Sequence, residues 1–107
     1  MKEIPKSTKV VVIGGGVAGT SCAYHLAKFG WKDVVLLERD QLTSGTTWHA
    51  AGLLGQLGAS STITKIRKYS LDLYKELEKV TGLSTGMKQN GAITVASTKE
   101  RMQELLR

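Results

Sequence analysis

The first half of the chain places a helix-forming stretch between two short, uninterrupted apolar runs. Residues 9–13 and 34–37 are dominated by valine, isoleucine and leucine, a pattern typical of strands that are buried on both faces of a parallel sheet. Small and helix-forming residues fill positions 17–29, and Gly30 stands where a helix C-terminus favours a left-handed residue. The pattern predicts a β-α-β unit over about residues 8–40.

The next stretch, residues 41–61, follows neither a helical nor a strand period, and it contains four glycines. A structureless segment of this length is uncommon in a compact domain unless it binds a ligand. Helical spacing returns over residues 63–80, and Gly82 supplies a stop. The apolar stripe of that helix consists of Ile63, Ile66, Leu73, Leu77 and Val80. We therefore expect a ligand-binding loop followed by an amphipathic helix.

The last part of the chain predicts one more strand and one more helix. The turn-forming residues 89–91 introduce residues 91–96, whose composition favours a strand. Ser97 and Glu100 have the spacing of a capping box, so the final helix is expected to begin at Ser97. Because this helix meets no capping glycine or proline before Arg107, we expect the fold to be incomplete at its C-terminus.

The composition fits one small globular domain. Hydrophobic residues make up 41% of the 107 positions and charged residues 22%, which argues against a low-complexity or collagen-like chain. No apolar run approaches the roughly 20 residues that cross a bilayer, and the first residues have the features of neither a secretory signal nor a transit peptide. Cys22 is the only cysteine, which excludes an intrachain disulfide and a cysteine-rich zinc site. We expect no metal site and a cytoplasmic location.

The net charge of +6 raises the question of nucleic-acid binding. Only residues 65–68 are densely basic, and neither a zinc motif nor an aromatic RNA-binding pattern accompanies them. A solvated helix face is the better interpretation of these charges, and a basic nucleic-acid binder stays an alternative.

Residues 14–19 read Gly-Gly-Gly-Val-Ala-Gly, which satisfies the G-x-G-x-x-G pattern between a predicted strand and a predicted helix. In such a turn Gly14 would make the tight bend, Gly16 would let the backbone approach a pyrophosphate, and Gly19 would let the helix lie close to the strand. Amide groups at the helix N-terminus would face the phosphates. Glu38 ends the second strand, where its carboxylate could accept hydrogen bonds from a ribose and would repel a 2′-phosphate.

This arrangement predicts FAD or NAD as the ligand, because both contain an ADP half, and it disfavours NADP. The alternative is a glycine-rich turn without a ligand, with Glu38 as an ordinary surface acid. The agreement of strand, helix, second strand and acid favours a bound nucleotide. The expected fold class is α/β, a Rossmann-like β-α-β start of a doubly wound parallel sheet.

Residues 42–53, Leu-Thr-Ser-Gly-Thr-Thr-Trp-His-Ala-Ala-Gly-Leu, follow closely on residues 36–40. With residues 69–74, they make the chain resemble the dimethylglycine and sarcosine dehydrogenase family of flavoproteins over nearly its whole length. The resemblance implies that residues 1–107 form the N-terminal part of an FAD-dependent oxidoreductase domain, with a flavin-binding loop at about residues 41–61.

In family members that carry the Thr-Trp-His-Ala-Ala-Gly motif, the histidine is bonded to the 8α-methyl carbon of FAD, and the resemblance places this role on His49. A neutral imidazole nitrogen is a suitable nucleophile for such a bond near pH 7. The fingerprint and the resemblance together assign the cofactor site to Gly14, Gly16, Val17, Ala18, Gly19, Glu38, Arg39, Gly45, Thr46, Thr47, Trp48, His49, Ala50, Ala51, Gly52 and Leu53.

Within the loop, Gly45 and Gly52 would let the backbone approach the flavin. Thr46 and Thr47 would offer hydroxyls to polar edges of the cofactor, and Trp48 would lie beside the ring. Other residues with chemical potential are interpreted as packing residues, and these are Cys22, His25, Tyr69 and Tyr74.

The resemblance implies oxidative demethylation of dimethylglycine or sarcosine. Hydride would leave an N-methyl carbon for the flavin, and the iminium product would hydrolyse or pass its one-carbon unit to tetrahydrofolate. The folate-binding region, the substrate-binding residues and the catalytic residues would lie downstream of residue 107, and neither the electron acceptor nor the oligomeric state is indicated. We expect the 107 residues alone to be inactive, because so short a chain cannot enclose a whole FAD.

Two further functions stay open. One is a non-catalytic homologue similar to the regulatory subunit of pyruvate dehydrogenase phosphatase, which would act in protein interaction. The other is an NAD-linked dehydrogenase, which the binding of nicotinamide rather than flavin would distinguish.

Overall fold

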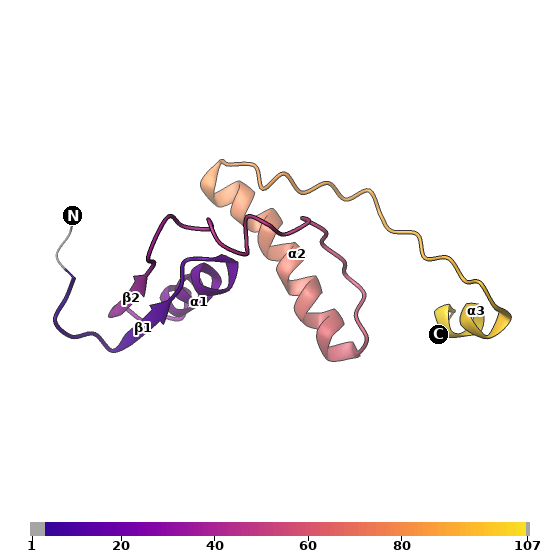
Figure 1. Cartoon of the computed structure of the whole chain (residues 1–107), viewed down its shortest axis with the longest axis horizontal. Coiled ribbons are helices and arrows are strands. Elements are labelled where there is room, and N and C mark those ends of the chain that lie inside the picture. Colours follow the sequence, from indigo (N-terminus) through magenta and orange to yellow (C-terminus); the bar gives the residue numbers. More distant parts are fainter. Residues whose placement is uncertain (1–3, 107) are drawn as a thin grey trace. The chain divides into compact units, whose positions relative to one another are not determined.

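The computed structural model describes residues 4–106, and the chain divides into two units after Leu53. The first unit contains strand β1 (Val10–Ile13), helix α1 (Val17–Lys28) and strand β2 (Val34–Leu37). The second contains the long helix α2 (Ser61–Thr81) and the short helix α3 (Lys99–Leu105). Figure 1 shows these elements along the chain.

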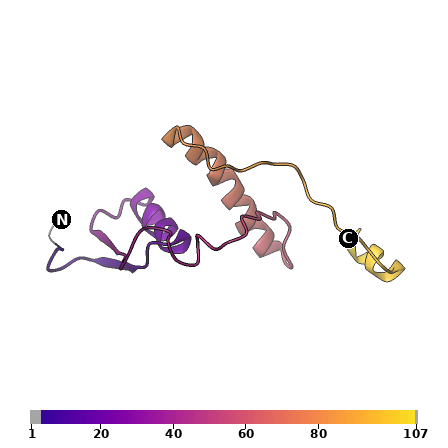
Figure 2. The same cartoon turned by 45° about the horizontal axis from the view of Figure 1, so that its top comes forward.

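The first unit is the β-α-β arrangement that the sequence predicts. β1 and β2 pair in parallel, with Val10 opposite Val34 and Ile13 opposite Leu37. Parallel neighbouring strands need a crossover connection, and α1 supplies it. The helix lies along the two strands in both views of the molecule (Figure 2). The helix ends at Lys28, and Gly30 takes the expected left-handed conformation with a φ of 88°.

The expectation that both strand faces are buried is wrong for this chain. Val10 and Val12 are half-buried, whereas Val11 and Ile13 are 49% and 85% exposed. The side chains of a strand alternate between the two faces, and within residues 4–53 only one face of the sheet is covered by a helix. Cys22 is also exposed, so its interpretation as a packing residue beside the sheet is wrong.

In the second unit, α2 is longer than its apolar pattern predicts because both ends are capped. The hydroxyl oxygen of Ser60 accepts a hydrogen bond from the Ile63 amide at 3.3 Å. At the other end Gly82 takes a left-handed φ of 68°, and its amide donates to the carbonyl of Glu78.

The predicted apolar stripe of α2 is partly wrong, since Ile63, Ile66 and Val80 are exposed and Leu71 is the most buried apolar side chain. Leu71 shares a helix face with Thr64 and Arg67. That face meets the preceding loop, where the Gly58 amide donates to the Thr64 hydroxyl at 3.1 Å and Arg67 donates to the Leu57 carbonyl.

The predicted strand over residues 91–96 is not formed. Figure 1 shows an extended trace between α2 and α3, and the side chains of Ile93 and Val95 stay exposed. A strand exists only when its backbone pairs with a neighbour, and within residues 4–106 this segment has no such neighbour. The cap of the helix that follows is Thr98, one residue later than the expected Ser97.

Helix α3 ends at Leu105 instead of continuing to the end of the chain, and Arg107 lies outside the described residues. No helix within residues 4–106 combines the length and the apolar character that crossing a membrane requires.

Candidate functional site

The glycine-rich turn joins the end of β1 to the start of α1. Gly14 adopts a φ of 102°, a conformation that strongly favours glycine, and its amide donates to the Leu37 carbonyl at 2.8 Å. A Cβ on Gly19 would lie 1.8 Å from the Gly14 carbonyl oxygen. The tight bend at Gly14 and the close helix–strand approach at Gly19 are therefore as the sequence predicts.

Gly16 leaves room for a contact that the sequence pattern does not reveal. A Cβ on Gly16 would lie 2.9 Å from the hydroxyl oxygen of Thr47. That hydroxyl accepts a hydrogen bond from the amide of Val17, the first residue of α1, at 2.9 Å. One of the helix-terminal amides that lack an intrahelical partner is thus satisfied by a side chain 30 residues further along the chain.

Glu38 holds the glycine-rich turn from the end of β2. Its carboxylate accepts the Gly15 amide at 2.6 Å and the Asp40 amide at 3.0 Å. The hydrogen bond from Gly15, followed by that from Asp40, keeps the pKa of Glu38 below its ordinary value. Since each carboxylate oxygen has two acceptor positions, both can still accept a further donor such as a ribose hydroxyl.

The segment after Glu38 folds into a series of turns that reach back to the glycines. The Thr43 amide donates to the Gly15 carbonyl at 3.0 Å, and the Trp48 amide donates to the Thr43 carbonyl at 3.1 Å. Thr43 has a φ of 65°, which is uncommon for a β-branched residue and costs conformational energy. Strain of this kind is frequent at ligand sites.

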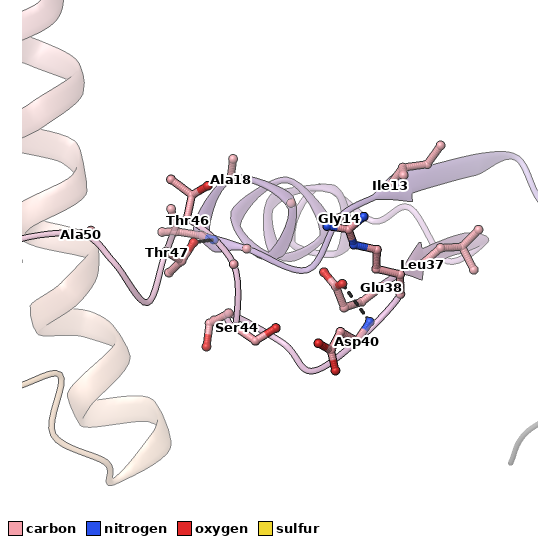
Figure 3. A pocket seen from close by; sticks show the side chains of 16 residues that line it. Ile13, Gly14, Ala18, Leu37, Glu38, Asp40, Ser44, Thr46, Thr47 and Ala50 are labelled. Atoms are coloured by element: carbon pink, nitrogen blue, oxygen red, sulfur yellow. Dashed lines mark hydrogen bonds between the residues drawn. The ribbon is translucent and has the colours of Figure 1, made fainter.

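These elements line an open cavity of about 790 Å³ within the first unit, a volume in the range of small-molecule sites. Figure 3 shows the carboxylate of Glu38 beside the Asp40 amide and Thr47 near the start of α1. The cavity is lined by eleven of the residues that the sequence assigns to the cofactor: Gly14, Gly16, Val17, Ala18, Gly19, Glu38, Arg39, Gly45, Thr46, Thr47 and Ala50.

The other five assigned residues do not line the cavity, and these are Trp48, His49, Ala51, Gly52 and Leu53. Trp48 is 79% exposed, so nothing in the described chain covers its ring. His49 is exposed, and its Nδ1 lies 2.9 Å from the carbonyl oxygen of Gly45. Because a carbonyl oxygen only accepts, Nδ1 carries the hydrogen of the neutral ring and the lone pair is on Nε2.

The structure also brings to the cavity residues that sequence reasoning missed: Ile13, Leu37, Asp40, Thr43 and Ser44. Ile13 and Leu37 are the last residues of the two parallel strands. The rule that open α/β sheets bind ligands at the carboxyl ends of their strands could have found them. Thr43 and Ser44 lie in the flavin-binding loop predicted at about residues 41–61, but they were not singled out, because their positions depend on the turns after Glu38.

The remaining candidates lie outside this cavity. His25 Nδ1 meets the Ser21 carbonyl within α1 at 2.7 Å, and the ring of His25 lies 5.2 Å from that of Tyr24. These contacts agree with the packing interpretation of His25. Among residues 4–106 the structure gathers no group of three metal-ligating side chains.

The residues present fit an FAD molecule at its ADP end. The bend at Gly14, the amides at the start of α1 and the carboxylate of Glu38 face one cavity, as pyrophosphate and ribose require. The amides of Gly16 and Ala18 would hold the phosphates, since those of Gly14 and Val17 are donated to Leu37 and Thr47, and Glu38 would hold the ribose. In the loop that carries His49, Ala50 is the last residue that lines this cavity.

Comparison with known proteins agrees with this geometry. A family model described as FAD dependent oxidoreductase matches residues 9–107. The chain is 48% identical to human mitochondrial sarcosine dehydrogenase over 107 residues, and 50% identical to rat mitochondrial dimethylglycine dehydrogenase over 96 residues. It is also 45% identical over 104 residues to the mouse mitochondrial pyruvate dehydrogenase phosphatase regulatory subunit.

These alignments cover 99%, 90% and 97% of the chain, respectively, but only 12%, 11% and 12% of those relatives. Among solved structures, glycine oxidase from Bacillus cereus matches with a TM-score of 0.67 and 31% identity, over 94% of this chain and 29% of that one. The chain thus spans about an eighth of the length of these curated relatives.

Proposed function

Because the chain belongs to the FAD-dependent oxidoreductase family, we propose that it forms the nucleotide-binding start of an enzyme that oxidises an N-methylated glycine, dimethylglycine or sarcosine. The observation that carries the proposal is the single cavity shared by the Gly14 bend, the start of α1 and Glu38. Membership implies FAD as the cofactor. The two dehydrogenases among the relatives support the substrate class.

The residues of this chain would bind and orient the cofactor. The amides at the start of α1 would hold the pyrophosphate, because the helix N-terminus carries a partial positive charge. Glu38 would hold the ribose and, through Gly15, the turn itself. Bound FAD supplies the chemistry by accepting a hydride from the substrate N-methyl carbon. The iminium that this leaves would react with water to give formaldehyde and the demethylated amine.

We extend the proposal to a covalent bond between the flavin 8α-methyl carbon and His49. The bond would replace one C–H bond of that methyl group, whose hydrogen would leave as a proton while the two electrons pass to the flavin ring, to be removed by the electron acceptor of the enzyme. Nδ1 of His49 is engaged by the Gly45 carbonyl, so the Nε2 lone pair is the one available for bonding. The exposure of His49 supports this role, since an exposed residue is accessible to a cofactor.

The covalent bond is tested with the full-length protein. After acid denaturation we expect flavin fluorescence to stay on the polypeptide of the wild type and to be lost from His49→Ala. His25→Ala is the matched control, because its Nδ1 also meets the carbonyl four residues earlier, yet it lies within α1. Flavin that stays attached in His49→Ala would contradict the bond and leave FAD binding itself intact.

The substrate is tested by mixing the anaerobic full-length protein with saturating dimethylglycine or sarcosine. Loss of the oxidised-flavin absorbance supports the dehydrogenase. A protein that binds FAD but is reduced by neither amine would instead favour a regulatory homologue, the second candidate, which rests on the 45% identity to the phosphatase regulatory subunit. Transfer of the one-carbon unit to tetrahydrofolate and a cytoplasmic location stay predictions.

A further inference from the structure

The hydroxyl of Thr47 stands at the junction of the glycine-rich turn and the loop that carries His49. Among residues 41–50, Thr47 is the only one that is not exposed. Its oxygen accepts the Val17 amide at 2.9 Å, and the same side chain lines the cavity. The side chain is therefore fixed against α1 rather than turned to solvent.

The bonding capacity of this hydroxyl is only half used. A threonine hydroxyl can accept hydrogen bonds and donate one. Within the described chain Thr47 accepts from Val17, and its own hydrogen is donated to no protein group. That hydrogen can therefore be donated to an oxygen of a molecule in the cavity. Because the oxygen is already polarised by the amide at the helix N-terminus, it is a stronger donor than an isolated hydroxyl.

Thr47 also organises the backbone around His49. The Thr47 carbonyl accepts the Ala50 amide at 3.3 Å, and the Thr46 carbonyl accepts the His49 amide at 3.1 Å. The turns over these residues touch the glycine-rich turn at two places. One is the main-chain bond from Thr43 to Gly15, and the other is the side-chain bond from Val17 to Thr47.

We propose that Thr47 is a positioning residue that couples the phosphate end of the site to the turn bearing His49. Its hydroxyl donates to a phosphate oxygen while it accepts from Val17, so an occupied phosphate site fixes the backbone of residues 45–50. This inference rests on the proposed FAD function and deepens it. The nucleotide half, bound first, would place the histidine before the flavin half is seated.

The requirement for glycine at position 16 supports the coupling. With Gly16 at a φ of −76°, alanine is compatible with the backbone there, yet its Cβ would lie 2.9 Å from the Thr47 oxygen. The Thr47 hydroxyl would then have to shift from its position beside the Val17 amide. Gly16→Ala and Thr47→Val are thus expected to break the same contact from its two sides.

The coupling is tested in the full-length protein without flavin, with ADP as the probe. Hydrogen exchange is followed at the amides of Trp48, His49 and Ala50. ADP is expected to slow exchange at all three in the wild type and in Thr47→Ser, which keeps the hydroxyl. In Thr47→Val, ADP should bind about tenfold more weakly, and at saturation it should leave these amides unprotected.

Two controls separate the phosphate from other causes. Adenosine, which has no phosphate, is expected to bind without protecting residues 48–50. Thr62→Val removes an exposed hydroxyl from α2 and is expected to behave as the wild type. If saturating ADP protected these amides in Thr47→Val as well as in the wild type, the coupling would be overturned and FAD binding would stand. No binding of ADP to the wild type would instead overturn the proposed function, and the coupling with it.

Discussion

The two units of this chain are held by interactions of different range. In the first unit, side-chain hydrogen bonds join residues 23, 25 and 30 positions apart: Glu38 to Gly15, Thr8 to Asp33 and Thr47 to Val17. In the second unit the bond from Arg67 to Leu57 spans 10 positions, and the bonds accepted or donated by Ser60, Ser70, Thr81 and Thr98 span three or four. The first unit therefore depends on tertiary closure, whereas the second depends on local capping.

This difference explains why the candidate site lies in the first unit. A cavity needs walls from several parts of the chain, and here they come from β1, α1, the end of β2 and the turns after it. The second unit consists of helices whose ends are satisfied by Ser60, Gly82 and Thr98, and their formation needs no distant partner.

The largest expected effect that tests this contrast is at Gly19. In Gly19→Val, the new Cβ would overlap the Gly14 carbonyl oxygen, since 1.8 Å separates the two positions. We expect the first unit to lose about 3 kcal/mol or more of unfolding free energy, measured by urea denaturation of the full chain. Gly55→Ala in the second unit meets only the end of the Arg67 side chain, at 3.9 Å, and should cost less than about 0.5 kcal/mol. Equal losses would remove the contrast.

An effect of intermediate size is expected in the pH dependence of stability, through the carboxylates of Glu38 and Glu78. The pKa of Glu38 is lowered mainly by the Gly15 amide, and the pKa of Glu78 mainly by the hydroxyl of Thr85, seven residues away. A carboxylate with a lowered pKa in the folded state stabilises the fold above its unfolded pKa. That contribution is lost as the pH falls through the folded value, so both contributions should disappear below the ordinary glutamate range.

Titration of the Gly19→Val variant tests whether the low pKa of each glutamate depends on distant or on local contacts. Side-chain NMR should then show the pKa of Glu38 rising to its ordinary value, because its partner Gly15 belongs to the disrupted turn. The pKa of Glu78 should stay low, because Thr85 is held locally. A simultaneous return of both values would show that the two units unfold together.

The smallest expected effect is at Thr43, the one described non-glycine residue with a positive φ. Thr43→Gly relieves the backbone strain but makes the unfolded chain more flexible, so we expect a gain of no more than about 0.5 kcal/mol. Thr43→Ala keeps a Cβ in the strained conformation and should bring no gain. Thermal unfolding of the two variants measures the difference, and a loss of stability in Thr43→Gly would show that the threonine side chain itself is needed.

Local patterns accounted for most of the secondary structure and part of the site. The apolar runs at residues 10–13 and 34–37, the fingerprint from Gly14 to Gly19 and the acid at position 38 each lie where the sequence predicts. The strand expected at 91–96 was wrong, because pairing depends on a neighbour that local sequence does not contain. The cap at Thr98 was missed because adjacent serine and threonine residues compete for the same role.

The amino-acid sequence by itself determined the order of β1, α1 and β2, the glycines of the turn between β1 and α1, and the family to which the chain belongs. These properties follow from side-chain periodicity, backbone conformational preference and motif spacing, all of which act over a few residues. Only the tertiary structure decided that Thr47 accepts the first amide of α1, that Glu38 accepts the Gly15 amide and that His49 does not line the cavity. Each of these depends on how the turns after β2 close against the glycine-rich turn, and that closure joins residues too far apart for any local pattern to record.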